Sequence, residues 1–218
     1  MPRSRLAVGL LAVGLGAVVA GALLQRPGTT TQVGVVPSPR AATPLPGADV
    51  ARYPVAFARS GGQLARAAAR PVMLRMPRLG LSARVVPVGV GPAGALAVPD
   101  DPSVLGWWSS GAAPGDASGS LVVDGHVDSA RYGIGVFARL RELKVGDTVE
   151  LRAASGRTVV FAVAGRRSYA KSSLPPSVFD QSFGERLVLI TCGGRFDRRT
   201  AHYKDNVVLY AVPVAGRG

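Results

Sequence analysis

The sequence predicts a mainly β protein, a barrel or sandwich of roughly 145 residues that follows an N-terminal membrane segment and a linker. Three observations lead to this prediction. From residue 72 onward, short runs rich in β-branched and aromatic residues are separated by Gly, Pro and Asp. Only one stretch of this region has clear helical spacing. The residues before it are first uncharged and then proline-rich, with no strand pattern.

The chain begins with a stretch long enough to cross a membrane. Arg3 and Arg5 come first, and the nineteen residues 6–24 carry no charge. At 1.5 Å per residue such a helix spans about 28 Å, close to the hydrocarbon core of a bilayer. The basic start predicts a cytoplasmic N-terminus at residues 1–5 and an extracytoplasmic remainder. We therefore favour a single-pass anchor in the cell membrane over a cleaved signal peptide, although residues 20–22 (AGA) resemble a cleavage site.

Residues 25–70 are expected to form a linker. Proline recurs there among Thr, Ala and Gly, without a sustained apolar period. Because proline fixes φ and favours extended backbone, this stretch should act as a semi-stiff spacer. Residues 63–70 (QLARAAAR) are either a short helix or the end of the linker. The folded domain then occupies residues 71–218.

Seven runs of this domain are expected to be strands. They are residues 72–76, 83–88, 120–123, 148–153, 158–164, 186–191 and 206–214. Residues 153–157 (AASGR) predict a hairpin turn between two of these runs. One helix is expected at residues 136–143, whose apolar positions follow helical spacing, and Gly146 shortly after it suits its end.

The net charge of +13 does not indicate a nucleic-acid partner. Nearly all of the basic residues are arginine, and the only lysines are Lys144, Lys171 and Lys204. The sequence has no basic helix, no aromatic-interleaved RNA-binding run and no zinc-finger spacing. A basic surface that faces an anionic cell envelope is the interpretation we adopt.

The single cysteine and one of the two histidines each follow an apolar run. Cys192 directly follows residues 187–191 (LVLIT), and His126 directly follows residues 121–125 (LVVDG). A lone thiol outside the cytoplasm has no internal disulfide partner, so it is a liability unless it reacts. Two strands that each end in a reactive side chain would bring a thiol and an imidazole together on a rigid scaffold.

A thiol that attacks an amide carbonyl places negative charge on oxygen, which a guanidinium stabilises well. Arg195, Arg198 and Arg199 follow Cys192 closely and are the candidates. No metal or cofactor is expected, because the two histidines and the cysteine lack zinc-like spacing and no acidic cluster suits calcium.

Several motifs together resemble the sortase family, most closely the class F sortases of high-GC Gram-positive bacteria. The motifs are GWW at 106–108, GAAPG at 111–115, VVDGHVDS at 122–129, VFARL at 136–140, VGD at 145–147, LITCGGRFDR at 189–198 and HYKDNVVLYA at 202–211. The resemblance runs from about residue 72 to residue 214 and includes the order His, Cys, Arg.

This resemblance implies a closed sortase β-barrel of about eight strands with short helices, and a membrane-bound cysteine transpeptidase. Cys192 would attack the Thr–Gly carbonyl of an LPXTG-like sorting signal, and His126 would act as general acid and base. Arg198 would stabilise the oxyanion and orient the peptide, with Arg195 and Arg199 as alternatives. An amine, such as that of a peptidoglycan precursor, would resolve the thioester and link the protein to the cell wall or to another protein.

Four further residues are expected to contact the substrate: Thr191, Gly193, Gly194 and Asp128. The two glycines leave their backbone N–H groups open to a developing oxyanion. Asp128 follows His126 by two residues in the same motif.

Two positions depart from the family pattern. Many sortases carry the arginine on the last strand, where this chain has Asp205, and Lys204 beside it supplies charge without a bidentate fork. Asp124 stands where a small residue is expected. Facing the site, its carboxylate would raise the pKa of the imidazole; facing outward, it would have no such effect.

Two alternatives from other classes remain open at this point. L,D-transpeptidases carry their cysteine in an S-x-G-C setting, which differs from Ile190-Thr191-Cys192 here. A membrane-tethered β-barrel binding module with an inert core cysteine is the non-enzymatic alternative, because free cysteine is often buried. Alkylation of Cys192 in the folded protein separates a buried thiol from a reactive one.

Overall fold

The computed structural model describes residues 32–37, 55–91, 95–182 and 184–214, so the predicted anchor at 6–24 lies outside the described residues. Within these ranges no helix is both long and apolar enough to span a bilayer. The main strands are β2 Pro71–Met76, β3 Leu81–Val88, β4 Val104–Trp108, β5 Ser120–Gly125, β8 Thr148–Ala153, β9 Thr158–Ala170, β10 Arg186–Asp197 and β11 His202–Pro213.

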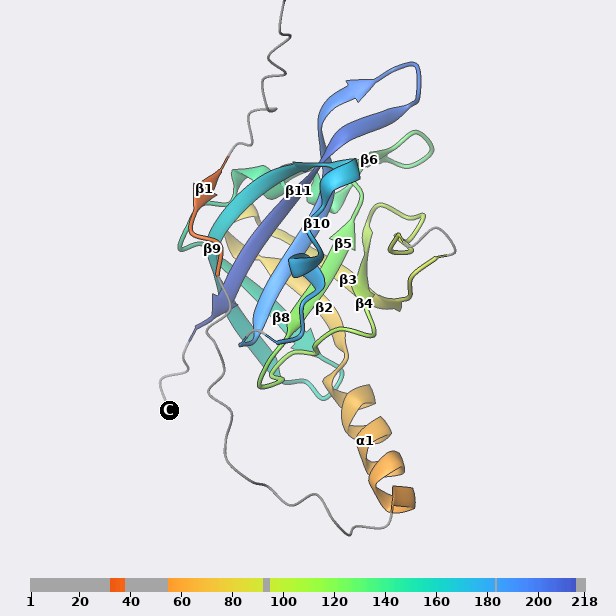
Figure 1. The fold of residues 1–218 in the computed structure, drawn as a ribbon, viewed down its shortest axis with the longest axis vertical. Helices are drawn as coiled ribbons and strands as arrows, with labels where there is room; N and C mark the ends of the chain where they lie inside the picture. Colours follow the sequence, from red (N-terminus) through yellow and green to blue (C-terminus); the bar gives the residue numbers. More distant parts are fainter. Residues whose placement is uncertain (1–31, 38–54, 92–94, 183, 215–218) are drawn as a thin grey trace, which may run out of the picture.

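These eight strands close into a barrel (Figure 1), which confirms the predicted fold class. Their hydrogen-bonded order is β9, β11, β10, β5, β4, β3, β2 and β8, and the pairing of β8 with β9 closes the circle. Most neighbours are antiparallel, but β3 with β4 and β5 with β10 are parallel pairs.

Strands β5 and β10 are buried on both faces. In β5, Leu121 and Val123 face the interior of the barrel, whereas Val122 belongs to a second cluster on its outer face. Aromatic side chains of Trp108, Tyr169 and Phe179 pack against this outer cluster. Burial on both faces explains why these strands read as continuous apolar runs rather than as alternating ones.

All seven expected strands are present, but some run further than predicted. Strands β9, β10 and β11 extend beyond the apolar runs through polar residues, so that the β10–β11 hairpin projects from the barrel (Figure 1). The sequence analysis missed β4, whose central Gly106 weakens the strand pattern. The predicted turn at residues 153–157 is confirmed, with the N–H of Gly156 donating to the carbonyl of Ala153.

The helix expected at residues 136–143 is a 3₁₀ helix, η2 Val136–Glu142. It begins after Gly135 and ends where Leu143 returns to extended backbone. A segment of seven residues is too short to gain much from α-helical propagation. Phe137 and Leu140 are nevertheless buried in the core, which accounts for the apolar spacing in the sequence.

Two elements lie within the predicted linker. Helix α1, Val55–Ala69, ends beside the barrel, where the Arg66 guanidinium donates to the carbonyl of Gly111 at 2.7 Å. Strand β1, Val33–Gly34, pairs antiparallel with the outer edge of β9, opposite Gly165 and Arg166. Part of the linker is therefore held against the folded domain.

Candidate active site

Each of the two candidate catalytic residues comes directly after the paired segment of a parallel strand pair. In the register of β5 with β10, Gly125 lies opposite Thr191. His126 directly follows Gly125, and Cys192 directly follows Thr191. Because paired strands lie about 4.8 Å apart, this register places an imidazole and a thiol on neighbouring backbone positions.

A buried hydrogen bond fixes this register at the end of the barrel. The hydroxyl of Thr191, which is only 3% exposed, donates to the carbonyl oxygen of Gly125 at 2.7 Å. Gly125 itself has no room for a side chain, since an added Cβ would lie 2.5 Å from Leu105 and 3.0 Å from Phe137. Thr191 therefore holds the two strands together at this end of the barrel, and its contact with the substrate stays a prediction.

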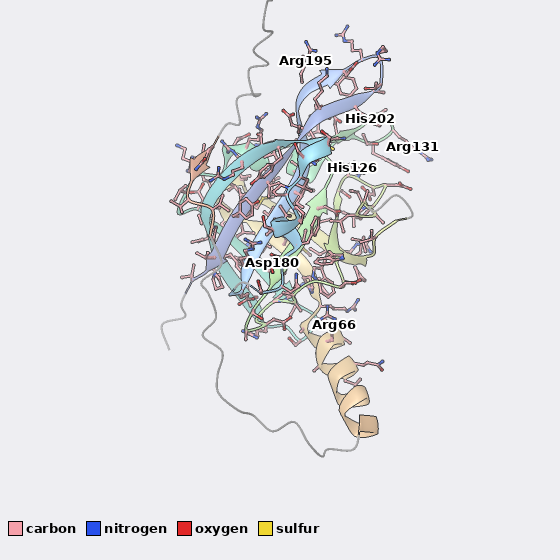
Figure 2. All side chains as sticks on the ribbon, viewed as in Figure 1. Arg66, His126, Arg131, Asp180, Arg195 and His202 are labelled. Carbon is pink, nitrogen blue, oxygen red and sulfur yellow. The ribbon has the colours of Figure 1, made fainter. Side chains whose placement is uncertain are left out.

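Cys192 and His126 line the same cavity, which has a volume of about 820 Å³. Figure 2 shows His126 and His202 at this end of the barrel. The Cys192 thiol is partly exposed, so it is not a buried core cysteine. A smaller depression of about 280 Å³ lies over β2 and β8, and neither a cysteine nor a histidine lines it.

Three short elements surround the cavity. They are the hairpin of β6 Asp128–Ser129 with β7 Gly133–Ile134, the 3₁₀ helix η3 Lys171–Ser173, and the projecting β10–β11 hairpin. The β10–β11 hairpin contributes Phe196 and Tyr203, whose rings meet edge to face at 5.1 Å. Sequence reasoning did not identify Phe196, Tyr203 or Lys171 as site residues.

Asp128 and Tyr203 join the two hairpins across the cavity. The Tyr203 hydroxyl donates to Oδ2 of Asp128 at 2.6 Å. This hydrogen bond raises the pKa of Tyr203, and burial and the negative charge of Asp128 add to the effect. Asp128 is the only acidic residue among the described residues that line the cavity.

The three candidate arginines do not line this cavity. Arg198 and Arg199 are exposed in the turn between β10 and β11, and Arg195 lies on the projecting hairpin (Figure 2). The only Lys or Arg among the described lining residues is Lys171. The role of Arg198 therefore stays a prediction, and its side chain would have to approach the substrate from the hairpin.

Lys204 lies on the strand that pairs with Cys192, although it does not line the cavity. Cys192 pairs with Asn206 of β11, and Lys204 lies two residues away on the same face of that strand. The Lys204 ammonium is 3.7 Å from the Asp197 carboxylate. Of the two glycines after Cys192, Gly193 is buried and Gly194 is exposed with a φ of 74°.

Asp124 does not line the cavity. Its side chain is 4% exposed and fills the space over Gly106, where an added Cβ would lie 2.3 Å from Asp124 Oδ1. Neither carboxylate oxygen makes a hydrogen bond of normal geometry with a described residue. Burial raises the pKa of this carboxyl to about 7, and the backbone N–H groups of Asp124 and Gly106 oppose only part of the shift.

No group of three or more His, Cys, Asp or Glu side chains in the described part of the chain is arranged to hold a metal ion. The arrangement instead suits covalent acyl transfer, in which a partly exposed thiol and an imidazole share one cavity.

Comparison with known proteins agrees with this chemistry. The family model described as Sortase domain matches residues 74–214, more than half of the chain. A lid mutant of sortase A from Corynebacterium diphtheriae is 20% identical, with a TM-score of 0.52, covering 67% of this chain and 72% of its own. Sortase C1 from Streptococcus agalactiae is 17% identical, with a TM-score of 0.52, covering 68% and 69%. No curated protein matches the chain.

At these identities the two solved structures support the fold, and the family match extends over almost the whole barrel from β2 to the end of β11. Sortases are cysteine transpeptidases that act in general on surface-protein sorting signals and amine acceptors. The chain belongs to the sortase family.

Proposed function

We propose that this sortase is a membrane-anchored, extracytoplasmic enzyme of the class F type, which cleaves an LPXTG-like sorting signal between Thr and Gly. The observation that carries the proposal is one cavity lined by both Cys192 and His126, each the residue that follows the last pair in the parallel register of β10 with β5. The anchor is supported by the uncharged stretch at residues 6–24 behind two arginines.

In the first half of the reaction, the Cys192 sulfur attacks the carbonyl carbon of the threonine in the sorting signal. A tetrahedral oxyanion forms, which a guanidinium stabilises; we assign this role to Arg198, with Arg195 and Arg199 as alternatives. The C–N bond then breaks, and His126 gives its proton to the departing amine of glycine. The product is a thioester on Cys192.

In the second half, an acceptor amine attacks the thioester carbon. His126 takes a proton from the attacking nitrogen, the C–S bond breaks, and the Cys192 thiolate leaves. The new amide joins the substrate protein to the acceptor, such as an amine of a peptidoglycan precursor. Without an acceptor, water resolves the thioester and the enzyme acts as a peptidase.

Mass spectrometry of the full chain in detergent tests the proposal. We expect incubation with an LPXTG-type peptide to add the acyl fragment to Cys192, and hydroxylamine to remove it as a hydroxamate. Cys192→Ala should form no adduct, and Cys192 in the unreacted enzyme should be alkylated by iodoacetamide.

Two results would count against the proposal in different ways. A thiol that resists alkylation and forms no adduct contradicts the nucleophilic role of Cys192. An alkylated thiol with no adduct across a panel of peptides contradicts the LPXTG-like specificity alone. The anchor is tested separately, since a protein held by residues 6–24 stays with membranes during carbonate extraction.

A further inference from the structure

The cavity contains more space and more polar groups than the thiol and imidazole require. We propose that the part between the β6–β7 hairpin and the β10–β11 hairpin is the acceptor site, where Asp128 binds the ammonium group of the incoming amine. The ligand class is a primary amine on an aliphatic stem. This inference rests on the proposed transpeptidase function and extends it to the second substrate.

The position of His126 indicates which part of the cavity receives an amine. The leaving amine of the first half-reaction and the attacking amine of the second occupy the same side of the acyl carbon, because one histidine serves both. His126 lines the cavity, and the β6 strand that begins two residues later forms its wall. An amine in contact with His126 is therefore in the same cavity as the Asp128 carboxylate.

Asp128 has the chemistry and the accessibility for an ammonium ion. Its side chain is exposed to the cavity, and the bond from Tyr203 occupies Oδ2. A carboxylate has about four acceptor positions, so acceptor positions remain for a second donor. The Tyr203 bond also ties Asp128 to the opposite hairpin, which lowers the cost of fixing its geometry when the ligand binds.

The rest of the wall suits an aliphatic stem. Ile134 is 84% exposed, an unusual exposure for a large apolar side chain, and Phe196, which lines the same cavity, is 46% exposed. Apolar side chains exposed around a polar centre are typical of a binding surface. Lys171 carries the same charge as the ligand and would repel it, so Asp128 is the only charged side chain among the described lining residues that attracts a cation.

The bound ammonium first loses one proton through His126 to water, and its neutral nitrogen then attacks the thioester carbon. As the C–S bond breaks and its electrons return to sulfur, the attacking nitrogen loses a second proton to His126. The imidazolium then holds this proton beside the thiolate or gives it to the sulfur. No oxidant, metal or further reactant takes part.

A competition experiment on the full chain tests the site. Two acceptors are supplied together with one LPXTG-type peptide: N-α-acetyl-lysine amide, which is cationic at neutral pH, and hydroxylamine, which is largely uncharged. The ratio of the lysine product to the hydroxamate is measured by mass spectrometry. Both products come from one thioester, so the ratio does not depend on the acylation rate or on the amount of folded enzyme.

We expect Asp128→Asn to lower this ratio about fivefold, the size expected for a partly exposed ion pair. Asp128→Glu, which keeps the carboxylate, should retain most of the preference, and Tyr203→Phe should lower it less than Asp128→Asn. Asp197→Asn is the matched control, because it removes the same charge from the neighbouring hairpin without lining the cavity. The control should leave the ratio unchanged.

An unchanged ratio in Asp128→Asn would overturn the acceptor site while leaving the sortase chemistry intact. An equal fall in Asp197→Asn would also overturn it, because long-range charge would then account for the preference. If the wild-type enzyme forms neither product and no thioester, the proposed function itself fails, and the acceptor site with it.

Discussion

The hydroxyl of Thr191 donates a 2.7 Å hydrogen bond to the carbonyl oxygen of Gly125, across the parallel pair of β10 and β5. Each of these residues directly precedes a residue to which we assign a catalytic role, Cys192 and His126. One buried contact thus sets the distance between the proposed nucleophile and the proposed acid and base.

Replacement of Thr191 by Val tests this contact. The variant keeps the shape of the side chain but leaves the Gly125 carbonyl without its partner, which costs about 1–3 kcal/mol of unfolding free energy. We expect kcat/KM for a sorting peptide to fall by more than the loss of folded protein explains. Thr191→Ser restores the hydroxyl and should recover most of the activity. Full activity in Thr191→Val would show that other contacts fix the register.

Gly125→Ala tests the packing beneath His126. The added Cβ would lie 2.5 Å from Leu105 and 3.0 Å from Phe137, both fully buried. Overpacking of this kind costs about 1–3 kcal/mol, so denaturant unfolding should show a lower midpoint. Gly62→Ala in α1 is the control, because an added Cβ there meets nothing. Equal midpoints for Gly125→Ala and wild type would contradict the packing described above.

The buried carboxyl of Asp124 predicts a dependence of stability on pH. Its pKa is about 7 in the folded protein, against an ordinary value of 3.8. Between these pH values the folded state holds a proton that the unfolded chain has lost. The free energy of unfolding therefore decreases as pH rises through this window, by an amount on the order of 4 kcal/mol, and levels off above it.

Asp124→Asn should remove this decrease. Denaturant unfolding of wild type and variant from about pH 5 to about pH 8 measures the difference curve, in which the other titrating groups cancel. We expect the variant to gain on wild type as pH rises. Asp100→Asn, at an exposed position, should follow wild type. A difference curve that is flat for Asp124→Asn would mean that this carboxyl is ionised in the folded protein.

Replacement of Arg198 by Ala tests the assigned cation. Loss of a donor to the oxyanion lowers kcat by roughly a hundredfold or more. Arg198→Lys should recover only part of this loss, because lysine lacks the planar fork. Lys171→Ala and Lys204→Ala are measured in parallel, since Lys171 lines the cavity and Lys204 shares a face with the partner of Cys192. Loss of activity in one of these and not in Arg198→Ala would reassign the role.

The strands of the barrel that are buried on both faces could be predicted from the sequence. Runs such as 121–123 and 187–190 are continuously apolar because both faces of β5 and β10 are covered. Strand β4 was not predictable, because Gly106 interrupts it and its fit depends on Asp124 of the neighbouring strand. Whether η2 is an α-helix or a 3₁₀ helix also depends on tertiary packing, since the spacing of Phe137 and Leu140 fits either type.

The site was predictable only in part, for a similar reason. Cys192 and His126 stand at the ends of recognisable runs, so their approach follows from strand pairing. Lys171 and Tyr203 reach the cavity through a 3₁₀ turn and a projecting hairpin, whose positions depend on contacts between segments distant in sequence. No local pattern encodes the 2.6 Å bond between Tyr203 and Asp128.

Together with the proposed anchor, the pairing of β1 with β9 would limit how far from a membrane this enzyme can act. With residues 6–24 in a bilayer, only the seven residues 25–31 separate the lipid from the strand-bound segment that begins near Gln32. Fully extended, they span about 25 Å. With the proposed anchor, substrate and acceptor would both have to be presented within a few nanometres of the lipid surface, which would favour partners that are themselves still attached to the membrane.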